Sequence, residues 1–188
     1  MKAYYPVFFD LEGRRCLVIG GGEIAQHKVE GLLAAGARVT VIAPKLTRDL
    51  RRLLAEGKID LVQREYREGD IESYEICMVA TDDGAVNAEV AAEGRRRRVW
   101  VNAADDPANC DFILPSIIRR GAITIAASTG GMSPALARRL REELEAYLTE
   151  EMPALAELLS EVRNDLRLRG ITPDVEVWQQ AIDEDLRV

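Results

Sequence analysis

A glycine-rich loop between a short apolar run and an amphipathic segment constrains this chain more than any other feature. Cys16 to Ile19 are apolar and partly branched, as in a buried parallel strand. Gly20, Gly22 and Ala25 follow at the spacing G-x-G-x-x-G/A, which opens a helix in dinucleotide-binding folds. Gly20 allows a tight turn, Gly22 lets amides approach a pyrophosphate, and Ala25 lets the helix pack closely on the strand. The spacing indicates a nucleotide site, although a plain tight turn can carry the same glycines.

Strands and helices alternate along the first hundred residues. Strands are expected at 16–19, 38–43, 59–63, 76–80 and 99–102, and helices at about 23–35, 47–56 and 85–94. Gly36 is expected as the C-cap of the first helix and Thr47 as the N-cap of the second. This alternation predicts a Rossmann-like, doubly wound parallel sheet of the α/β class. Ligands of such sheets bind at the carboxyl ends of the strands, so we expect the loops 20–25, 43–45 and 81–83 to meet there.

The loop after the second predicted strand does not identify the cofactor as NAD or NADP. In the standard NAD pattern, an acid at this point binds the ribose hydroxyls. Here the chain reads Ala43-Pro44-Lys45, without a carboxylate. Lys45 suits a 2′-phosphate, and backbone groups alone can also hold a ribose. These residues therefore do not choose between NAD and NADP.

Composition excludes several classes of protein. The 188 residues hold no apolar run close to the roughly 20 that a membrane helix needs, and the first residues lack the apolar region of a signal peptide. Three cysteines lie far apart with no Cys-x-x-Cys pair, which favours a cytoplasmic setting over a disulfide framework or zinc site. We expect no membrane partner and no bound metal.

The net charge of −7 is concentrated at one end of the chain. Residues 141–188 carry 13 acidic and five basic residues, so the acidity does not oppose an anionic ligand near the glycine loop. An acidic balance argues against nucleic acid as a partner. The run Arg95 to Arg98 is interpreted as a solvated helix end, with a phosphate or partner contact as the alternative.

A polar turn, Asp105-Asp106-Pro107-Ala108-Asn109, follows the last predicted strand of the sheet. Catalytic groups often lie past such strand ends, and paired carboxylates can raise one another's pKa for proton transfer. A solvated Asp-Pro turn explains the same residues equally well.

Beyond this turn the alternation changes. Strands are expected at 112–115, 117–118 and 122–127, with no glycine-loop helix between them. The segment Ser128 to Pro134 then opens a helix with Ser133 as its N-cap, and its hydroxyls, glycines and free amides suit a carboxylate or phosphate. Helices are expected near 134–148, 153–168 and 173–186. Their apolar positions need a partner surface, so we predict a homodimer.

Seven stretches, in order over about residues 6–145, resemble the precorrin-2 dehydrogenase family, which includes the N-terminal module of sirohaem synthases. They are Pro6-Val-Phe, Cys16-Leu-Val-Ile-Gly-Gly-Gly-Glu-Ile-Ala, Ala34-Ala-Gly-Ala-Arg-Val-Thr-Val, Ala80-Thr-Asp-Asp, Val101-Asn-Ala-Ala-Asp-Asp-Pro, Phe112-Ile-Leu-Pro-Ser-Ile-Ile and Ser128-Thr-Gly-Gly-Met-Ser-Pro-Ala-Leu-Ala-Arg. Together they are far more specific than the glycine loop alone.

The resemblance implies an architecture and a reaction. The architecture is a Rossmann NAD-binding domain at 1–113, a small α+β dimerisation region at 114–148 and a helical tail at 149–188. The reaction is the NAD-dependent oxidation of precorrin-2 to sirohydrochlorin, so the cofactor is NAD rather than NADP. Some family members also insert iron into the product, and chelatase activity stays open here. The sequence lacks the methyltransferase half of fused members, so we expect dehydrogenase activity without it.

The resemblance also implies site residues. Asp105 matches the catalytic aspartate, with proton acceptor as its expected role. The expected NAD contacts are Gly20, Gly22, Glu23, Ile24, Ala25, Pro44, Lys45 and Thr81. Precorrin-2 carries eight carboxylates. This charge suits the loop from Ser128 to Pro134 and the arginines near it as a binding site. The expected substrate contacts are Ser128, Thr129, Gly130, Ser133 and Arg138.

A different class of protein shares part of this pattern. A non-catalytic, NAD-responsive regulatory domain also has the glycine loop and the parallel sheet. It needs neither Asp105 nor the segment from Ser128 to Pro134, and it usually carries an acid after the second strand.

Overall fold

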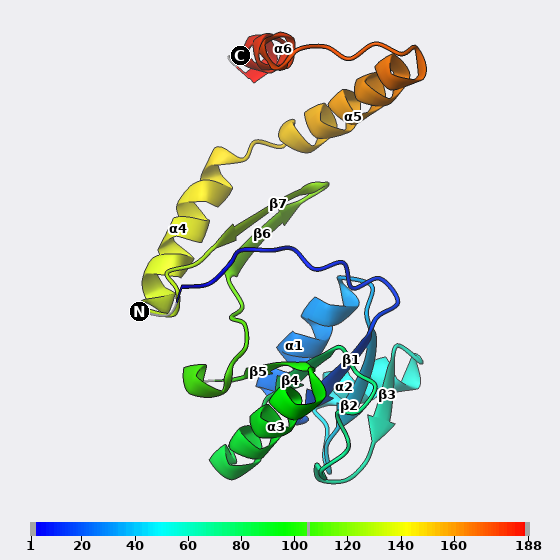
Figure 1. The fold of residues 1–188 in the computed structure, drawn as a ribbon, viewed down its shortest axis with the longest axis vertical. Coiled ribbons are helices and arrows are strands. Elements are labelled where there is room, and N and C mark those ends of the chain that lie inside the picture. The colour runs from blue at the N-terminus through cyan, green and yellow to red at the C-terminus, as the bar shows by residue number, and fades with distance from the viewer. Residues whose placement is uncertain (1–2, 105, 187–188) are drawn as a thin grey trace. The chain divides into compact units, whose positions relative to one another are not determined.

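The computed structural model describes residues 3–104 and 106–186, which divide into an N-terminal unit, Met1–Leu114, and a C-terminal unit, Pro115–Val188. The strands of the N-terminal unit are β1 (Arg15–Ile19), β2 (Arg38–Ile42), β3 (Ile59–Val62), β4 (Ile76–Val79) and β5 (Trp100–Ala103). They form one parallel sheet in the order β3-β2-β1-β4-β5 (Figure 1). The order reverses between β1 and β4, the point at which doubly wound sheets bind ligands. The predicted fold class is confirmed.

Three helices connect these strands: α1 (Glu23–Leu33), α2 (Arg48–Ala55) and α3 (Gly84–Arg97). Thr47 caps α2 by accepting a 3.2 Å hydrogen bond from the Leu50 amide, as the sequence predicts. Asp83 caps α3 in the same way, through a 2.8 Å bond from the Ala85 amide. The end of α1 differs from the prediction, because Ala34 is the C-cap and Gly36 lies beyond it with a positive φ of 77°.

The central strands β1 and β4 are mostly apolar because both faces of the sheet are covered there. Cys16 and Val18 of β1 pack with α1 and α2 on one face, whereas Leu17 and Ile19 pack with α3 on the other. β4 divides in the same alternating way. Because all neighbouring strands of this sheet are parallel, their carboxyl ends lie at one edge, and the loops that form the site follow there.

The arginine run belongs to the last turn of α3 and its C-cap. Arg96 pairs with Glu68 at 2.7 Å, and Arg97 pairs with Glu93 at 2.5 Å. Arg98 is the C-cap, in the left-handed conformation with a φ of 59°. Cations suit the carboxyl end of a helix, so these contacts favour the helix-end interpretation over a phosphate site.

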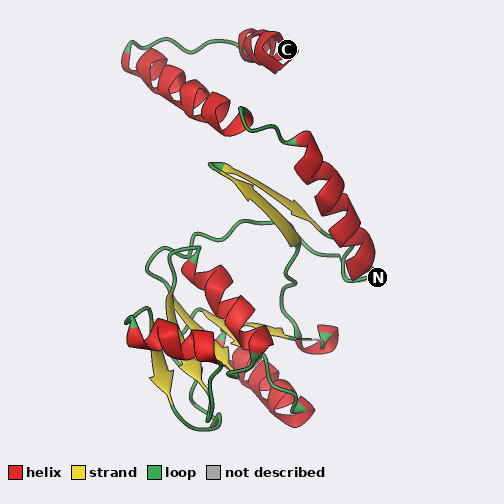
Figure 2. Ribbon diagram, turned by 180° about the vertical axis from the view of Figure 1, so that it is seen from behind, coloured by secondary structure: helices red, strands yellow, loops and turns green. Residues whose placement is uncertain are grey.

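The C-terminal unit contains β6 (Ser116–Arg120), β7 (Ile123–Ala127), α4 (Pro134–Tyr147), α5 (Met152–Leu168) and α6 (Val175–Leu186). β6 and β7 form an antiparallel pair, and α4 packs against both strands (Figure 2). The predicted strand at Phe112–Pro115 is wrong. The Phe112 carbonyl accepts a 2.9 Å bond from the side chain of Asn102 instead of a ladder bond, and Pro115 has no N–H to donate.

No helix within the described residues is long and apolar enough to span a bilayer.

Candidate functional site

A cleft of about 790 Å³ opens at the carboxyl edge of the sheet, where β1, β2, β3 and β4 end. Its walls are Ile19, Gly20, Gly21, Gly22, Glu23, Ile24, Ile42, Pro44, Lys45, Leu46, Thr47, Glu65, Tyr66, Ala80, Thr81, Asp82, Asp83 and Val86. Backbone hydrogen bonds tie its loops together, from Gly20 N to Ile42 O at 2.9 Å and from Thr47 N to Gly21 O at 2.9 Å. The three loops that the sequence predicts to meet do meet here.

The three glycines of the loop have different physical reasons. A Cβ on Gly20, whose φ is +120°, would lie 2.2 Å from the carbonyl oxygen of Ala80, and a Cβ on Gly21 would lie 2.0 Å from that of Lys45. Neither position can take a side chain without moving backbone. A Cβ on Gly22 would meet no atom within 4 Å, so the space beside Gly22 is open to a ligand. The sequence interpretation named Gly20 and Gly22 and missed Gly21, although the glycine triplet was its signal.

The N-terminus of α1 faces this cleft. Gly22 is the N-cap, and within the described residues no side chain makes a capping hydrogen bond there. Unpaired amides and the partial positive charge of a helix start suit a phosphate. Glu23 and Ile24 line the cleft, whereas Ala25 is fully buried and does not. Ala25 therefore acts as the sequence suggests, by letting α1 lie close to β1.

The loops after β2 and β4 form the two sides of the cleft. Pro44 and Lys45 line it after β2, where no carboxylate follows the strand. Thr81 lines it after β4, and its hydroxyl accepts a 3.1 Å bond from the Asp83 amide and lies 3.3 Å from the Asn87 side chain. Thr81 thus holds the turn that starts α3.

A buried carboxylate supports the far wall. Glu93 of α3 is fully buried, accepts a 2.9 Å bond from the Gly69 amide, and is bonded by the hydroxyl of Tyr66 and by Arg97. Burial raises the pKa of Tyr66 far above its usual range, and the bond to Glu93 raises it further. Tyr66 therefore stays a neutral donor and holds the chain segment after β3 against α3.

A second arrangement, which the sequence interpretation missed, joins α1 to β5. Nζ of Lys28 donates a 2.7 Å hydrogen bond to Oδ1 of Asn102, and Nδ2 of Asn102 donates to the Phe112 carbonyl. Asn102 is buried, with 6% of its surface exposed. Only the tertiary fold brings these residues together, since 74 positions separate them.

The loop after β5 is held at several points. Sγ of Cys110 lies 3.2 Å from the Ala103 amide, and the Asp111 carboxylate accepts a 2.9 Å bond from the Val101 amide. The carboxylate of Asp106 accepts a 2.8 Å bond from the side-chain amide of Asn109, at the other end of the short 3₁₀ turn Pro107–Asn109. Asp105, the predicted catalytic residue, lies outside the described residues.

In the C-terminal unit, the predicted anion loop uses most of its own hydroxyls. Thr129 Oγ1 donates to the Ser133 carbonyl at 3.1 Å and accepts from the Ser133 amide at 3.0 Å. Ser133 caps α4 through the Leu136 amide, and Ser128 accepts a bond from the Gly130 amide. The hydroxyls therefore shape the loop.

Two groups of this region are left for a ligand. The Gly131 amide has no hydrogen-bond partner among the described residues, and a Cβ on Gly131 would meet no atom within 4 Å. Arg139 and Arg141 pair with acidic residues of their own helix, whereas Arg138 is exposed and has no such partner in the described part of the chain. Gly131 was not among the predicted contacts.

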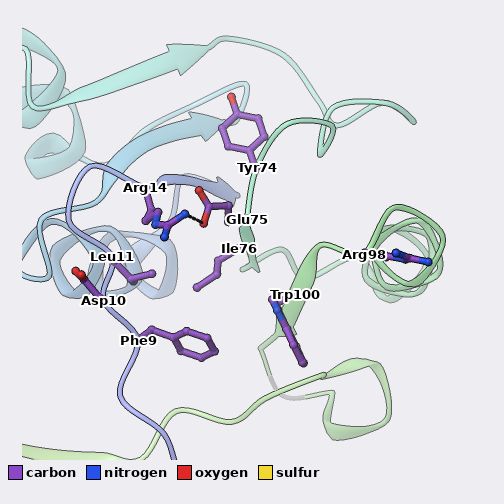
Figure 3. A pocket seen from close by; sticks show the side chains of 9 residues that line it. All are labelled: Phe9, Asp10, Leu11, Arg14, Tyr74, Glu75, Ile76, Arg98 and Trp100. Atoms are coloured by element: carbon purple, nitrogen blue, oxygen red, sulfur yellow. Dashed lines mark hydrogen bonds and ion pairs between the residues drawn. The ribbon is translucent and has the colours of Figure 1, made fainter.

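A smaller cavity of about 300 Å³ lies at the amino ends of β1, β4 and β5 (Figure 3). The ion pair between Arg14 and Glu75, 3.1 Å long, and the ring of Trp100 line it. No predicted site residue within the described part of the chain borders this cavity. Among residues 3–104 and 106–186, no group of three or more His, Cys, Asp or Glu side chains could hold a metal ion.

Comparisons with known proteins agree with this geometry. A family model for NAD(P)-binding domains matches residues 7–116, and the model of the sirohaem biosynthesis protein central region matches residues 120–147. The structure is similar to that of SirC, a precorrin-2 dehydrogenase, with a TM-score of 0.74 and 29% identity over 96% of this chain and 88% of SirC.

Curated relatives are longer proteins. A siroheme synthase of Pseudomonas paraeruginosa (strain DSM 24068 / PA7) is 40% identical over 92% of this chain and 37% of its own length. Siroheme synthase 1 of Serratia proteamaculans (strain 568) is 41% identical over 95% of this chain and 38% of its own length. The chain thus spans less than two fifths of these relatives. With a family model covering more than half of it, the chain belongs to the NAD(P)-binding family found in sirohaem biosynthesis proteins.

Proposed function

We propose that this protein oxidises precorrin-2 to sirohydrochlorin with NAD as the hydride acceptor. The similarity to a solved precorrin-2 dehydrogenase over 96% of the chain carries the proposal. The cleft supports it, because the space beside Gly22 and the uncapped start of α1 suit a pyrophosphate. The match of residues 120–147 to the sirohaem central region supports an enzyme over an NAD-responsive regulatory domain.

The chain's own residues supply binding, orientation and a proton acceptor. Bound NAD supplies the hydride acceptor, as nicotinamide cofactors do. The first-turn amides of α1 hold its pyrophosphate, and Pro44 and Lys45 flank its ribose. Asp105 accepts the proton that the substrate loses as the hydride leaves. A carboxylate suits this role because it is ionised at neutral pH.

The C-terminal unit binds the carboxylates of the tetrapyrrole in this proposal. Arg138 and the Gly131 amide are the donors that the loop leaves without partners in the described part of the chain. Ser128, Gly130 and the hydroxyl pair of Thr129 and Ser133 hold the loop in shape around them. Charge-assisted bonds from arginine to carboxylate are the strong kind.

A homodimer completes the proposal. Leu136, Leu140 and Leu144 lie along one side of α4 and are 51%, 38% and 38% exposed. Leu158 and Val162 of α5 are also exposed. A row of exposed apolar side chains along a helix fits an interaction face. We assign 114–148 to dimerisation and 149–188 to a helical tail, and light scattering at several concentrations tests this.

The cytoplasm is the proposed location. Cys16, Cys77 and Cys110 are buried free thiols. Burial raises the pKa of Cys16 to about 11, so it is protonated at neutral pH. Buried reduced thiols fit a reducing compartment.

The decisive experiment mixes the purified protein with NAD and anaerobically prepared precorrin-2, and follows the absorbance of sirohydrochlorin. We expect an NAD-dependent product, and its absence would overturn the proposal. Asp105→Asn should lower the rate of precorrin-2 oxidation at least about 100-fold, which is within the range of general-base catalysis. NAD should still bind to this variant. Asp106→Asn is the neighbouring comparison, and an equal loss there would contradict the assignment of the base. Ferrous or cobaltous ion added to the product measures chelatase activity separately.

A further inference from the structure

The loop after β2 lacks an acid, and the loop after the neighbouring strand β3 brings one into the same cleft. β3 lies beside β2 in the sheet, with Ala43 N bonded to Val62 O at 3.3 Å. Gln63 Nε2 lies 3.5 Å from the carbonyl oxygen of Pro44, so the two strand ends stay together past the ladder. Glu65, three residues beyond β3, lines the cleft with Pro44 and Lys45.

On the basis of the proposed function, we infer that Glu65 binds the adenosine ribose of the cofactor and determines the preference for NAD over NADP. In standard dinucleotide folds the acid that does this ends the second strand. Here that strand runs into Ala43-Pro44-Lys45, and an acidic residue from the loop after the adjacent strand borders the cleft at the same edge of the sheet.

The two neighbours of Glu65 in the chain, Arg64 and Tyr66, are each held by a buried or half-buried carboxylate. Arg64 forms two bonds of 2.6 and 2.7 Å with the carboxylate of Asp70. Tyr66 is bonded to the buried carboxylate of Glu93. These two contacts hold the backbone on both sides of Glu65. Within the described residues, the Glu65 carboxylate itself has no hydrogen bond or ion pair, so it is free to accept bonds from a ligand.

The charges of the cleft make Glu65 selective. A carboxylate accepts hydrogen bonds from a ribose 2′-hydroxyl and repels a 2′-phosphate, which is doubly charged near neutral pH. Among the described residues that line this cleft, Lys45 is the one cation, against the acids Glu23, Glu65, Asp82 and Asp83. Asp83 is occupied in capping α3. Lys45 and Glu65 form no ion pair with each other in the described structure, so each charge is available to a ligand in the cleft.

The test measures the affinities of NAD and NADP for the full chain by calorimetric titration. We expect wild-type protein to bind NAD at least about tenfold more tightly than NADP. With NADP, Glu65 loses one charge-assisted hydrogen bond to the 2′-hydroxyl and repels the 2′-phosphate. Glu65→Gln should weaken NAD about tenfold without weakening NADP, because the amide keeps the shape and loses the charge. The matched control is Glu68→Gln, in the same loop, whose carboxylate pairs with Arg96 and does not border the cleft.

Several results would overturn the inference. An NAD-to-NADP ratio that Glu65→Gln leaves within twofold excludes Glu65, and an equal change in Glu68→Gln means that net charge alone sets the ratio. Wild-type protein that binds neither dinucleotide also excludes the assignment. Glu65 is exposed, so the variant should fold, and Glu65→Ser with a thermal melt repeats the test. Failure of the proposed function shows itself differently, as bound NAD with no turnover of precorrin-2.

Discussion

The ammonium group of Lys28 donates a 2.7 Å hydrogen bond to the side-chain oxygen of Asn102. This bond links the helix that starts at the glycine loop to the strand that leads to Asp105. The side-chain nitrogen of Asn102 also donates to the Phe112 carbonyl, at the far end of the loop that follows β5. The cofactor loop and the loop with the proposed base are therefore held by one chain of side-chain contacts.

Lys28→Met keeps the side-chain stem and removes the charged donor. We expect kcat for precorrin-2 oxidation to fall roughly tenfold, because small displacements of a reacting group cost this much or more. The Kd for NAD should stay within about twofold, since no residue lining the cleft is altered. Lys58→Met, at an exposed lysine paired with Glu56, is the control. A loss of NAD affinity equal to the loss of kcat would contradict a positioning role.

Alanine substitutions at the two outer glycines of the loop, Gly20 and Gly22, should affect different properties of the protein. Gly20→Ala places a Cβ against the Ala80 carbonyl at a positive φ, so we expect the free energy of unfolding to fall by about 2–4 kcal/mol. Gly22→Ala meets no protein atom, so stability should change by less than about 1 kcal/mol. NAD affinity should nevertheless fall about tenfold or more, because the methyl group enters the phosphate space. Urea unfolding and NAD titration separate the two effects, and unchanged NAD binding by Gly22→Ala would remove Gly22 from the site.

Arg138 and Arg139 offer a matched pair on α4. Both are exposed, but Arg139 already pairs with Glu143 at 3.0 Å, and Arg138 has no such partner in the described part of the chain. Arg138→Ala should raise KM for precorrin-2 about fivefold, as loss of one solvent-exposed charged contact implies, while Arg139→Ala changes it less than about twofold. Steady-state kinetics at two salt concentrations measures both, and the difference should shrink at high salt. Equal effects would show that the helix contributes only general positive charge.

The loop between β3 and β4 should give the protein an acid-sensitive element. Arg64, through its two bonds to Asp70, holds the pKa of that carboxyl below its usual value, although burial opposes the shift. A carboxyl with a folded-state pKa below its unfolded value of about 3.9 stabilises the fold fully above about pH 5. The contribution is lost as the pH falls through the folded-state pKa. Asp70→Asn should lower stability at pH 7 and flatten its decline below pH 4, as thermal melts over pH 2–7 would measure. A variant with the wild-type slope would exclude Asp70.

Sequence patterns with a local cause predicted the fold well. The apolar run of β1 and the spacing of Gly20, Gly22 and Ala25 depend on neighbours in the chain, and so do the caps at Thr47 and Ser133. The same is true of the parallel sheet, because alternation of strands and helices allows few topologies. The alternation also predicted correctly that the loops 20–25, 43–45 and 81–83 meet at one edge of the sheet.

Side-chain pairs that are distant in the chain could not be predicted in this way. Lys28 with Asn102 and Tyr66 with Glu93 carry no pattern in the sequence, since each needs the fold before the partners meet. Glu65 carries no motif in the sequence either, since its place beside Pro44 and Lys45 depends on the pairing of β3 with β2. The wrong strand prediction at Phe112–Pro115 has a related cause. The side chain of Asn102 in β5 donates to the Phe112 carbonyl, which in a strand would accept a bond from a neighbouring strand.

The small interior of the C-terminal unit couples folding to concentration. Among its described residues only Ile118, Ala137 and Leu148 are buried hydrophobic side chains, although α4 and α5 together extend over 31 residues. Helices with so little buried surface of their own gain stability chiefly from what they pack against. If a second copy of the chain covers them, the midpoint of thermal unfolding rises with protein concentration by mass action. Dilution would then melt these helices first and leave the parallel sheet, with its cofactor cleft, still folded.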